Sequence, residues 1–408
     1  MPEPLRKPRR FNERKSAFVA TATRLINRKG VSGMSLADVT SELGMAPKAI
    51  AHYFKDKDDL AASCFLDAIG RMRACVAEAA HDDTPDARVV RFLRSYFALK
   101  ARVAEGKGHE LVAPNDIRAL NNADVNGAYA ELFRELRGLL VEAASPKRLR
   151  PAQNAATFLL ISHCHWSLFW LPSVWPERYP RTCDRLADIL LCGLAAPGVL
   201  WNPRPMPPVL TAGDPDGDSQ MELFLRAATE LINEQGYHGA SVERISARLK
   251  VSKGSFYHHI DSKDELVLAC FERTFDVFRR TIPLAEEQSK SGFQTLCTFV
   301  SALARVQVSG VGLLLRLSAG TTLPEGLRQR VQDNYTPIIN LIASIVSEGI
   351  SDGSIRPVDS LLAAQTIMGM INAADELRFF VPDITPAQTT DDYVKPCFLG
   401  LFNSLAAT

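Results

Sequence analysis

Apolar residues recur at intervals of three and four along most of the chain, the period of an α-helix that buries one face. The pattern is clearest in six segments: Phe92–Val103, Tyr129–Val141, Ala155–Trp170, Leu186–Leu194, Ile338–Ile350 and Leu361–Ile371. No segment shows a convincing alternation of apolar and polar residues between hairpin turns, as a half-buried strand would. The pattern therefore predicts an all-α protein with no sheet of three or more strands.

A stretch near the N-terminus occurs a second time. Phe18–Phe65 aligns with Phe224–Phe271 without a gap at a shift of 206 positions, and 16 of the 48 aligned pairs are identical. A period of this length indicates the duplication of a whole unit, whereas solenoids are built from repeats of 20–50 residues. We therefore expect two related units in one chain.

The boundary between the two units is predicted in residues 197–219, which are rich in proline and glycine. This composition does not support a helix and is typical of a semi-rigid linker, which at about 3.1 Å per residue reaches roughly 70 Å. The expected segments are a short helical module at 1–60, a larger helical domain at 61–196, the linker at 197–219, a second module at 220–266 and a second large domain at 267–408.

Each module is predicted to hold two short helices joined by a tight turn. In the first copy Ser35 is a good N-cap, Gly44 makes the turn, and the second short helix covers about Pro47–Tyr53. In the second copy Ser241 is the N-cap and the second short helix covers Ser252–His259. Two such helices held on a supporting helix form a helix-turn-helix, whose second helix enters the major groove of DNA.

The residues of both copies resemble the TetR/AcrR family of bacterial repressors. The resemblance lies in residues 228–237 (ATELINEQGY) and 251–266 (VSKGSFYHHIDSKDEL) of the second copy, and in residues 44–60 (GMAPKAIAHYFKDKDDL) of the first. It implies two TetR-like units in one chain, each a three-helix DNA-binding domain followed by a helical domain for ligand binding and dimerisation. About 100 residues carry the motif, and the others fit the family by pattern only.

The second copy carries the fuller set of expected DNA contacts. Ser252 caps the recognition helix, so the backbone N–H groups there suit a phosphate. Lys253, Ser255 and His259 are the expected readers of base edges. Phosphate contacts are expected from Tyr257, His258 and Lys263. The complete set predicted for this copy is Ser241, Ser252, Lys253, Gly254, Ser255, Tyr257, His258, His259 and Lys263.

The first copy departs from this pattern, because Ala46 stands in place of Ser252 and Ala51 in place of Tyr257. Its charge is higher: residues 1–60 have 12 Lys/Arg and 7 Asp/Glu, whereas residues 220–266 have 6 and 7. The basic stretch Arg6–Lys15 is expected to compensate by reaching phosphate or the minor groove. The alternative is that this copy only packs. Its predicted contacts are Ser35, Pro47, Lys48, Ala49, His52, Tyr53, Lys57, Arg9 and Arg10.

The resemblance also implies that the last two long helices of each unit pair in a four-helix bundle. Here these helices are expected at Pro151–Trp170 with Arg181–Leu194, and at Pro357–Phe380 with Asp391–Leu405. Their fusion in one chain suggests that the halves pair with each other as a covalent pseudo-dimer. The alternative is a homodimer of two chains that presents four modules.

Candidate residues for an effector pocket lie in both large domains. They are His163, Trp166 and Trp170 in the first domain, and Arg316, Asn372 and Asp375 in the second. The aromatic residues fit the wall of a hydrophobic pocket, and a packed core or a helix-pairing seam is the alternative. Residues two apart on a helix point in different directions, so His163 and His165 do not predict a metal site. No cofactor is expected.

Composition and missing motifs exclude several classes of protein. The eight cysteines include no CxxC pair, and no run of about 18 apolar residues predicts a membrane span. No signal peptide is recognisable, so a cytoplasmic protein is expected. The chain has no nucleophile elbow, HExxH, P-loop or dinucleotide-binding motif, which argues against an enzyme.

These observations favour a transcriptional repressor that binds a double-stranded operator and is released by an unknown small hydrophobic effector. The alternative is an architectural or protein-interaction protein whose helix-turn-helix modules no longer read sequence.

Overall fold

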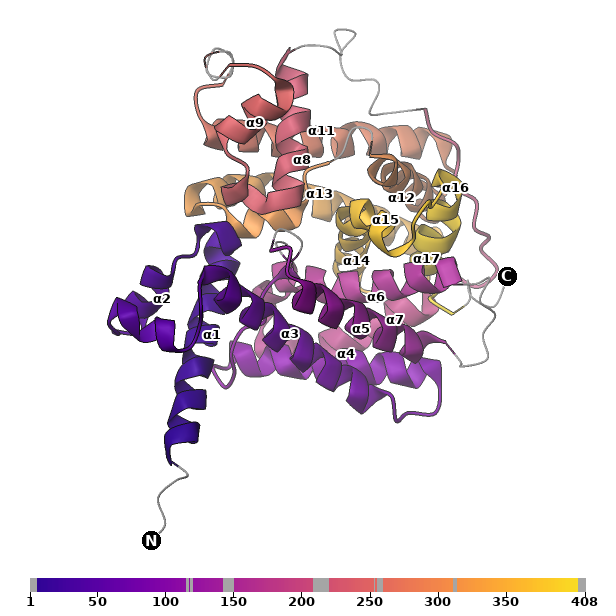
Figure 1. Ribbon diagram of the computed structural model, residues 1–408. Coiled ribbons are helices and arrows are strands. Elements are labelled where there is room, and N and C mark those ends of the chain that lie inside the picture. Colours follow the sequence, from indigo (N-terminus) through magenta and orange to yellow (C-terminus); the bar gives the residue numbers. More distant parts are fainter. Residues whose placement is uncertain are drawn as a thin grey trace.

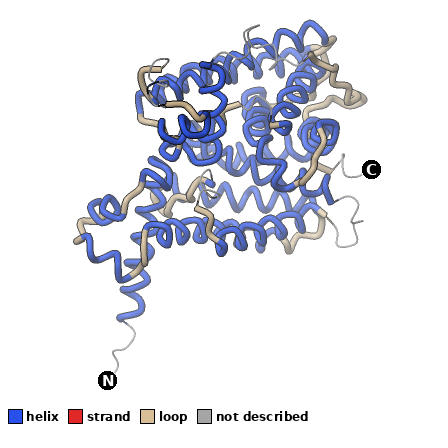
Figure 2. The backbone as a smooth tube through the Cα atoms, turned by 45° about the horizontal axis from the view of Figure 1, so that its top comes forward, coloured by secondary structure: helices blue, strands red, loops and turns tan. Residues whose placement is uncertain are grey.

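The computed structural model describes residues 6–114, 117, 120–141, 150–207, 220–252, 254, 260–310 and 314–402. Throughout these residues the regular elements are helices, as the tube in Figure 2 shows. The one β-type pairing that they contain is an isolated bridge between Ala195 and Ile355. The predicted all-α fold is confirmed.

The first half begins with a long helix, α1 (Arg6–Gly33), and continues through a short pair of helices into a larger helical domain (Figure 1). Its remaining elements are α2 (Leu36–Glu42), the 3-10 helix η1 (Pro47–His52), α3 (Lys57–Ala79), α4 (Pro85–Ala104), α5 (Ala123–Leu140), α6 (Arg150–Trp170), the 3-10 turns η4 (Leu171–Ser173) and η5 (Pro176–Arg178), and α7 (Tyr179–Cys192).

The second half repeats this order. Its elements are α8 (Gln220–Gly239), α9 (Val242–Leu249), α11 (Lys263–Gln288), α12 (Gly292–Ser309), the 3-10 helix η6 (Leu317–Thr322), α13 (Glu325–Ser351), α14 (Ser360–Ala373), the 3-10 turn η7 (Ala374–Glu376), α15 (Leu377–Phe380), α16 (Pro386–Gln388), the π-helix η8 (Thr389–Val394) and α17 (Lys395–Leu399). Helices α3, α4 and α5 pack on one another as α11, α12 and α13 do.

In both modules the same residue types end the first helix and begin the second. Gly30 and Gly236 have φ of 69° and 70°, so each ends the regular part of its helix, since the left-handed region suits glycine. The Ser35 side chain then accepts from the N–H of Asp38, and Ser241 accepts from that of Arg244, so each serine caps the next helix. The local sequence therefore dictates the backbone of both copies in the same way.

The two halves pack on each other through their last helices. Helix α14 contacts both α6 and α7, α6 also contacts η8, and α7 contacts α17. Exchanging α6 with α14, and α7 with the segment η8–α17, returns the same set of contacts. A set that is unchanged by this exchange is expected of a pseudo-two-fold axis. The described residues of one chain thus form the predicted pairing of halves, with α6 and α14 side by side (Figure 1).

Hydrogen bonds and ion pairs cross this seam. The carbonyl of Phe398 accepts from the N–H of Leu194 at 2.8 Å, and the carbonyl of Leu190 accepts from the N–H of Leu401 at 2.9 Å. Arg356 is paired with Asp188 at 2.8 Å and also donates to the carbonyl of Gly193. The halves are therefore joined by backbone as well as by side chains.

The start of the predicted linker lies against the second half. Residues 193–207 contain no helix, and the Trp201 ring packs 5.5 Å from the ring of Phe398. The N–H of Arg204 donates to the hydroxyl of Thr298 at 2.9 Å. Residues 208–219 lie outside the described residues. The boundaries of the five segments remain predictions.

Three predicted helices differ in extent. Helix α7 ends at Cys192 instead of Leu194, because Gly193 turns the chain at φ 70° toward the Phe398 carbonyl. The segment predicted as one helix from Pro357 to Phe380 begins at Ser360 and changes to a 3-10 turn after Ala373. The last helix ends at Leu399 instead of Leu405, because Gly400 has φ 98°.

Candidate DNA-binding interface

The reading helix of the first copy, η1, is held by apolar residues and presents polar ones. Ile50 and the following Phe54 are each 2% exposed and fix the helix on the module's core. Pro47, Lys48 and His52 are exposed, and Ala49 is half-buried. The residues that sequence predicted for DNA contact on this helix therefore lie on its accessible side.

This helix is a single 3-10 segment instead of an α-helix. Its N-cap, Ala46, makes no side-chain cap hydrogen bond. Pro47 has no N–H, and the N–H of Ala49 donates to the carbonyl of Ala46 at 2.9 Å, so backbone alone closes the first turn. The geometry agrees with the loss of a capping serine that the sequence shows at this position.

Two predicted DNA contacts of the first copy are engaged within the protein. The Tyr53 ring stacks on Phe11 at 4.6 Å and lies 5.2 Å from Phe18. The ammonium group of Lys57 donates to the carbonyl of Ser32 at 3.1 Å. Both side chains thereby brace the module, and contact with DNA would require Lys57 to exchange a partner.

The basic N-terminal stretch is helical from Arg6 onward and forms the first turns of α1, which project from the body of the molecule (Figure 1). Arg10, Arg14 and Lys15 are exposed. The Lys15 ammonium group also lies 5.6 Å from the centre of the Phe54 ring. The side chain of Arg9 lies outside the described residues.

In the second copy the structure places only part of the predicted contact set. Ser252 and Gly254 are exposed, and Ser241 is half-buried at the start of α9. Lys263 lies over the ring of Tyr237 at 4.1 Å, and burial lowers the pKa of its ammonium group. Lys253, Ser255, Tyr257, His258 and His259 lie outside the described residues.

An asparagine that sequence reasoning missed ties each module to its large domain. The Asn233 side chain donates to the carbonyl of Leu314 at 3.0 Å and accepts from the N–H of Arg316 at 2.9 Å. In the first half Asn27 donates to the carbonyl of Leu111 at 3.0 Å and accepts from the N–H of Ala113 at 2.8 Å.

Asn27 and Asn233 are among the identical pairs of the repeat. A polar residue kept at the same place in both copies, outside the residues predicted to contact DNA, was the signal available in the sequence.

We call these hydrogen bonds of Asn27 and Asn233 the joint between each module and its large domain. In the second half a buried arginine also takes part in the joint. Arg316, 8% exposed, is paired with Glu376, lies 3.9 Å from Asp375, and donates to the carbonyl of Asn233. Asn372 accepts from the N–H of Leu317 at 2.6 Å. The three polar residues predicted for an effector pocket are thus close together and take part in connecting η6, η7 and α8.

The aromatic candidates of the first half lie at the seam between the halves. Trp166 is 3% exposed, and a Cβ on Gly369 of α14 would lie only 2.6 Å from its ring. Its ring stacks on Phe169 at 4.8 Å. His163 and Trp170 are also buried, and burial lowers the pKa of His163 to about 4. This placement agrees with the alternative of a helix-pairing seam.

The two modules lie at the same end of the molecule and touch through their supporting helices (Figure 1). Helices α1 and α8 meet near their C-terminal ends, where a Cβ on Gly33 would lie 3.2 Å from the ring of His238. One chain therefore holds the supporting helices of its two modules next to each other.

None of the helices in the described part of the chain combines the length and the apolar character that crossing a membrane requires. No group of three or more His, Cys, Asp or Glu side chains in this part of the chain could hold a metal ion.

The two copies of the repeat both match a known protein family. The family model described as bacterial regulatory proteins, tetR family, matches residues 18–64 and 224–270. The regulator HbdR of Aromatoleum sp. (strain CIB) is 26% identical over 157 residues, which are 38% of this chain and 69% of HbdR.

The uncharacterised regulator YdeS of Bacillus subtilis (strain 168) is also 26% identical, over 48% of this chain and 94% of YdeS. The crystal structure of apo AibR superimposes with a TM-score of 0.38 at 22% identity, covering 44% of this chain and 99% of AibR.

Proposed function

Because this chain is a tandem member of the tetR family of bacterial regulatory proteins, with two copies of the family's DNA-binding segment, we propose that it represses transcription as a covalent pseudo-dimer. The observation that carries the proposal is the packing of its two halves about a pseudo-two-fold axis, which presents both modules at one end of the molecule. A protein that binds chromosomal DNA in a bacterium works in the cytoplasm.

The proposed operator is asymmetric. A homodimer reads two identical half-sites, because its two-fold symmetry is mirrored in the DNA. Here the two reading helices differ at most positions, as Lys48 against Gly254 and Ala51 against Tyr257 illustrate. Each module would therefore read its own half-site, the two half-sites lying about one helical turn, roughly 34–36 Å, apart.

The proposed division of labour gives the second copy most of the sequence specificity. That copy keeps the capping serine Ser252 and the phosphate donor Tyr257. The first copy contributes charge through its exposed helical start, which includes Arg10 and Arg14. Charge of this kind raises affinity for any DNA sequence and makes binding depend on salt.

Release from DNA is proposed to follow a shift in population between conformations that hold the reading helices differently. The Asn27 and Asn233 joints support this proposal, because they fasten each module to its large domain through hydrogen bonds at the same position. An effector that moves one of these domains would therefore move the attached module.

Two variants test the division of labour. Tyr257→Ala removes a phosphate donor and is expected to weaken specific binding by about 1–3 kcal/mol, as for a charge-assisted hydrogen bond. Removal of residues 1–15 is expected to lower affinity for all sequences and to flatten the dependence on salt. The measurement is affinity for the DNA upstream of the chain's own gene and for random DNA at two salt concentrations.

Lys48→Ala with His52→Ala is the matched change in the first copy. Intact operator binding in Tyr257→Ala, together with its loss in the matched variant, would show that the first copy is the main reader. Equal, weak binding of both DNAs by the unchanged protein would favour an architectural role.

A further inference from the structure

Four arginines line one cavity at the end of the first large domain that is farthest from the DNA-binding module. The cavity has a volume of about 600 Å³ and lies where the end of α3, the start of α4, α5 and the start of α6 meet. With 23 residues at about 1.5 Å each, α3 separates this cavity from the module by roughly 35 Å. The arginines are Arg88, Arg134, Arg137 and Arg150.

The described acidic residues that line this cavity offset only part of the positive charge of the four arginines. Asp83 is the one carboxylate among the residues that line it, and none of the four arginines forms an ion pair with a described Asp or Glu. Nearby acids are engaged elsewhere: Glu135 is paired with Arg73 at 2.5 Å, and Asp82 is paired with Arg91 at 3.2 Å.

The arginines are also placed for an anion from outside the protein. Arg88 donates to the carbonyl of Asp82 at 2.7 Å, which fixes its side chain without cancelling its charge. Burial, and then the neighbouring Arg150 and Arg134, lower the pKa of Arg137. Like charges crowded in this way favour binding of an anion, and arginine matches phosphate with paired hydrogen bonds.

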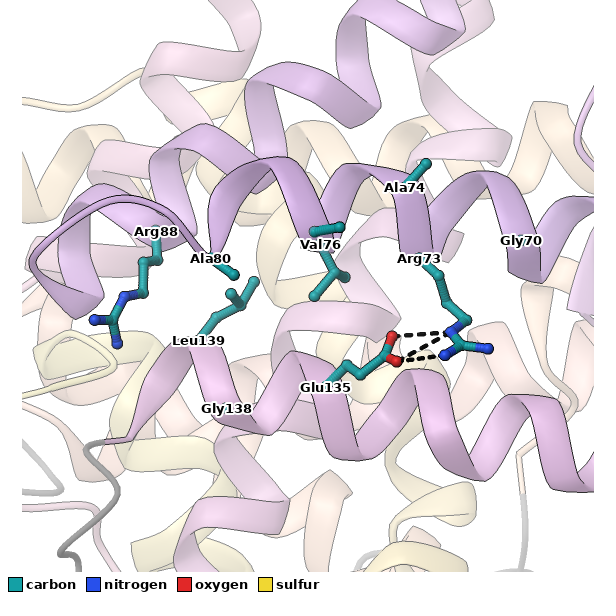
Figure 3. A pocket seen from close by; sticks show the side chains of 10 residues that line it. Gly70, Arg73, Ala74, Val76, Ala80, Arg88, Glu135, Gly138 and Leu139 are labelled. Carbon is teal, nitrogen blue, oxygen red and sulfur yellow. Dashed lines mark hydrogen bonds and ion pairs between the residues drawn. The ribbon is translucent and has the colours of Figure 1, made fainter.

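An apolar groove of about 690 Å³ continues from this cavity between α3 and α5. Ala80, Arg88 and Gly138 line both spaces, and Val76 and Leu139 form part of the groove's apolar wall. Figure 3 shows Arg88 at one end of the groove and the Arg73–Glu135 pair at the other.

Open space lies in front of Gly70 and Gly138, where a Cβ would meet no atom within 4 Å. Each space has the volume of a typical small-molecule site.

We propose that these two spaces form one ligand site, in which a phosphate head group binds the four arginines and an apolar chain lies along the groove. The site deepens the proposed function, on which it rests, by assigning the effector a chemical class: a phosphorylated amphiphile. This site is separate from the buried aromatic residues around His163 and Trp166, which are packed at the seam between the halves.

The site is connected to the DNA-binding module of the opposite half. Arg137 donates to the side-chain oxygen of Asn154 at 2.8 Å, and the Asn154 amide donates to the carbonyl of Phe380 at 2.9 Å. The Phe380 ring is held between Phe133 and Phe158, each 4.6 Å away. A residue of the second half therefore contacts both α5 and α6 of the first half, so a movement of either helix would displace it.

From Phe380 the connection continues to α8. Phe380 ends α15, which directly follows Glu376 in η7. Glu376 is paired with Arg316, and Arg316 donates to the carbonyl of Asn233 in the supporting helix of the second module. An anion that draws Arg137 into the cavity would therefore shift the hydrogen bonds that set the position of the second module.

The first experiment measures binding without DNA. Octyl phosphate, octanol and inorganic phosphate are titrated separately into the full chain in a calorimeter at pH 7.5. Octyl phosphate is expected to bind at least tenfold more tightly than either other compound. Arg134→Gln with Arg150→Gln removes two exposed charges and is expected to weaken octyl phosphate at least tenfold, whereas Arg102→Gln, an exposed arginine elsewhere on α4, leaves it unchanged.

Three outcomes would overturn the assignment: no binding of octyl phosphate, equal binding of octanol, or unchanged binding in the double variant. Inorganic phosphate binding as tightly as octyl phosphate would overturn the amphiphile and leave a site for a free anion.

The second experiment measures the response of DNA binding. Octyl phosphate is expected to lower the affinity of the unchanged protein for its upstream DNA at least tenfold. Asn154→Leu, of similar size, is expected to bind octyl phosphate with unchanged affinity and to lose this response. A variant that still responds would show that the connection through Asn154 is wrong.

Each affinity for DNA is also measured without octyl phosphate. Normal DNA binding with no octyl phosphate binding would reject the site and leave the proposed function standing. The opposite result would reject the proposed function and keep the site.

Discussion

The turn of each helix-turn-helix places one residue in the left-handed region, and the two copies use different residues there. Gly44 has φ 63° in the first copy, and Lys250 has φ 57° in the second. A side chain with a Cβ in this region costs roughly 1 kcal/mol relative to glycine. The second module therefore holds backbone strain that the first does not.

Lys250→Gly is expected to stabilise the second module by about 1 kcal/mol, because glycine relieves this strain. Gly44→Ala should destabilise the first module by a similar amount, since a Cβ there meets no atom within 4 Å and strain alone remains. Urea unfolding followed by circular dichroism measures both changes. A loss of stability in Lys250→Gly would show that the lysine side chain contributes more than the strain costs.

His163 gives the stability of the protein a dependence on pH. Burial lowers its pKa to about 4, below the value of about 6.5 in an unfolded chain. The unfolded state therefore takes up the proton first as pH falls. The stabilising effect of a neutral His163 is complete above about pH 6.5 and is lost progressively as pH falls toward about 4, amounting to roughly 3 kcal/mol.

His163→Leu is expected to reduce the fall in unfolding free energy between pH 7 and pH 4 relative to the unchanged protein. The exposed His81 provides the control, because His81→Gln should leave that fall unaltered. Urea titrations at several pH values give the comparison. An identical pH dependence in His163→Leu would mean that His163 titrates normally in the folded protein.

At the scale of elements, both halves join the module to the large domain through an asparagine at the same position. Asn233 is 7% exposed and joins α8 to the segment before η6, and Asn27 makes the equivalent bonds from α1. Neither residue interrupts the helical pattern, so the pattern alone did not mark them. Their role appears only when the following domain folds back on the supporting helix.

Asn233→Ala is expected to destabilise the protein by about 1–3 kcal/mol, because it leaves a buried carbonyl and a buried N–H without their partner. Asn27→Ala should cost less, because Asn27 is only half-buried and water can replace its bonds. Thermal unfolding of both variants is compared with Asn126→Ala, a change of an exposed asparagine. Equal costs for all three would show that the joint contributes little.

At the scale of the whole molecule, the seam between the halves depends on close packing. Gly369 of α14 lies against Trp166 of α6, where a Cβ would come within 2.6 Å of the indole ring. Adding a methyl group at such a place forces neighbours to shift, which costs about 1–3 kcal/mol. The two halves are therefore in contact at a point with no spare volume.

Gly369→Ala is expected to destabilise the protein and loosen the two halves. The same change at Gly127 on α5, where a Cβ meets nothing within 4 Å, should be neutral or slightly stabilising. Sedimentation should give the mass of one chain for the unchanged protein, and X-ray scattering should show a larger radius for Gly369→Ala. If the unchanged protein sediments as a tight dimer of two chains, an assembly with four modules would be favoured.

The sequence by itself determined the helices, the duplication and the caps. These follow from short-range causes: apolar periodicity, glycines that accept positive φ, and hydroxyls such as those of Ser35 and Ser241 that accept from an N–H three residues on. The family motif then identified the modules, because its residues are contiguous along the chain.

Only the tertiary structure decided which surfaces meet. Asn154 and Phe380 are 226 positions apart, and their hydrogen bond leaves no local signal. The same holds for the four arginines, which come from α4, α5 and α6 and gather in one cavity only because these helices pack at their ends. A periodic pattern shows that a helix buries one face, and long-range packing chooses the partner of that face.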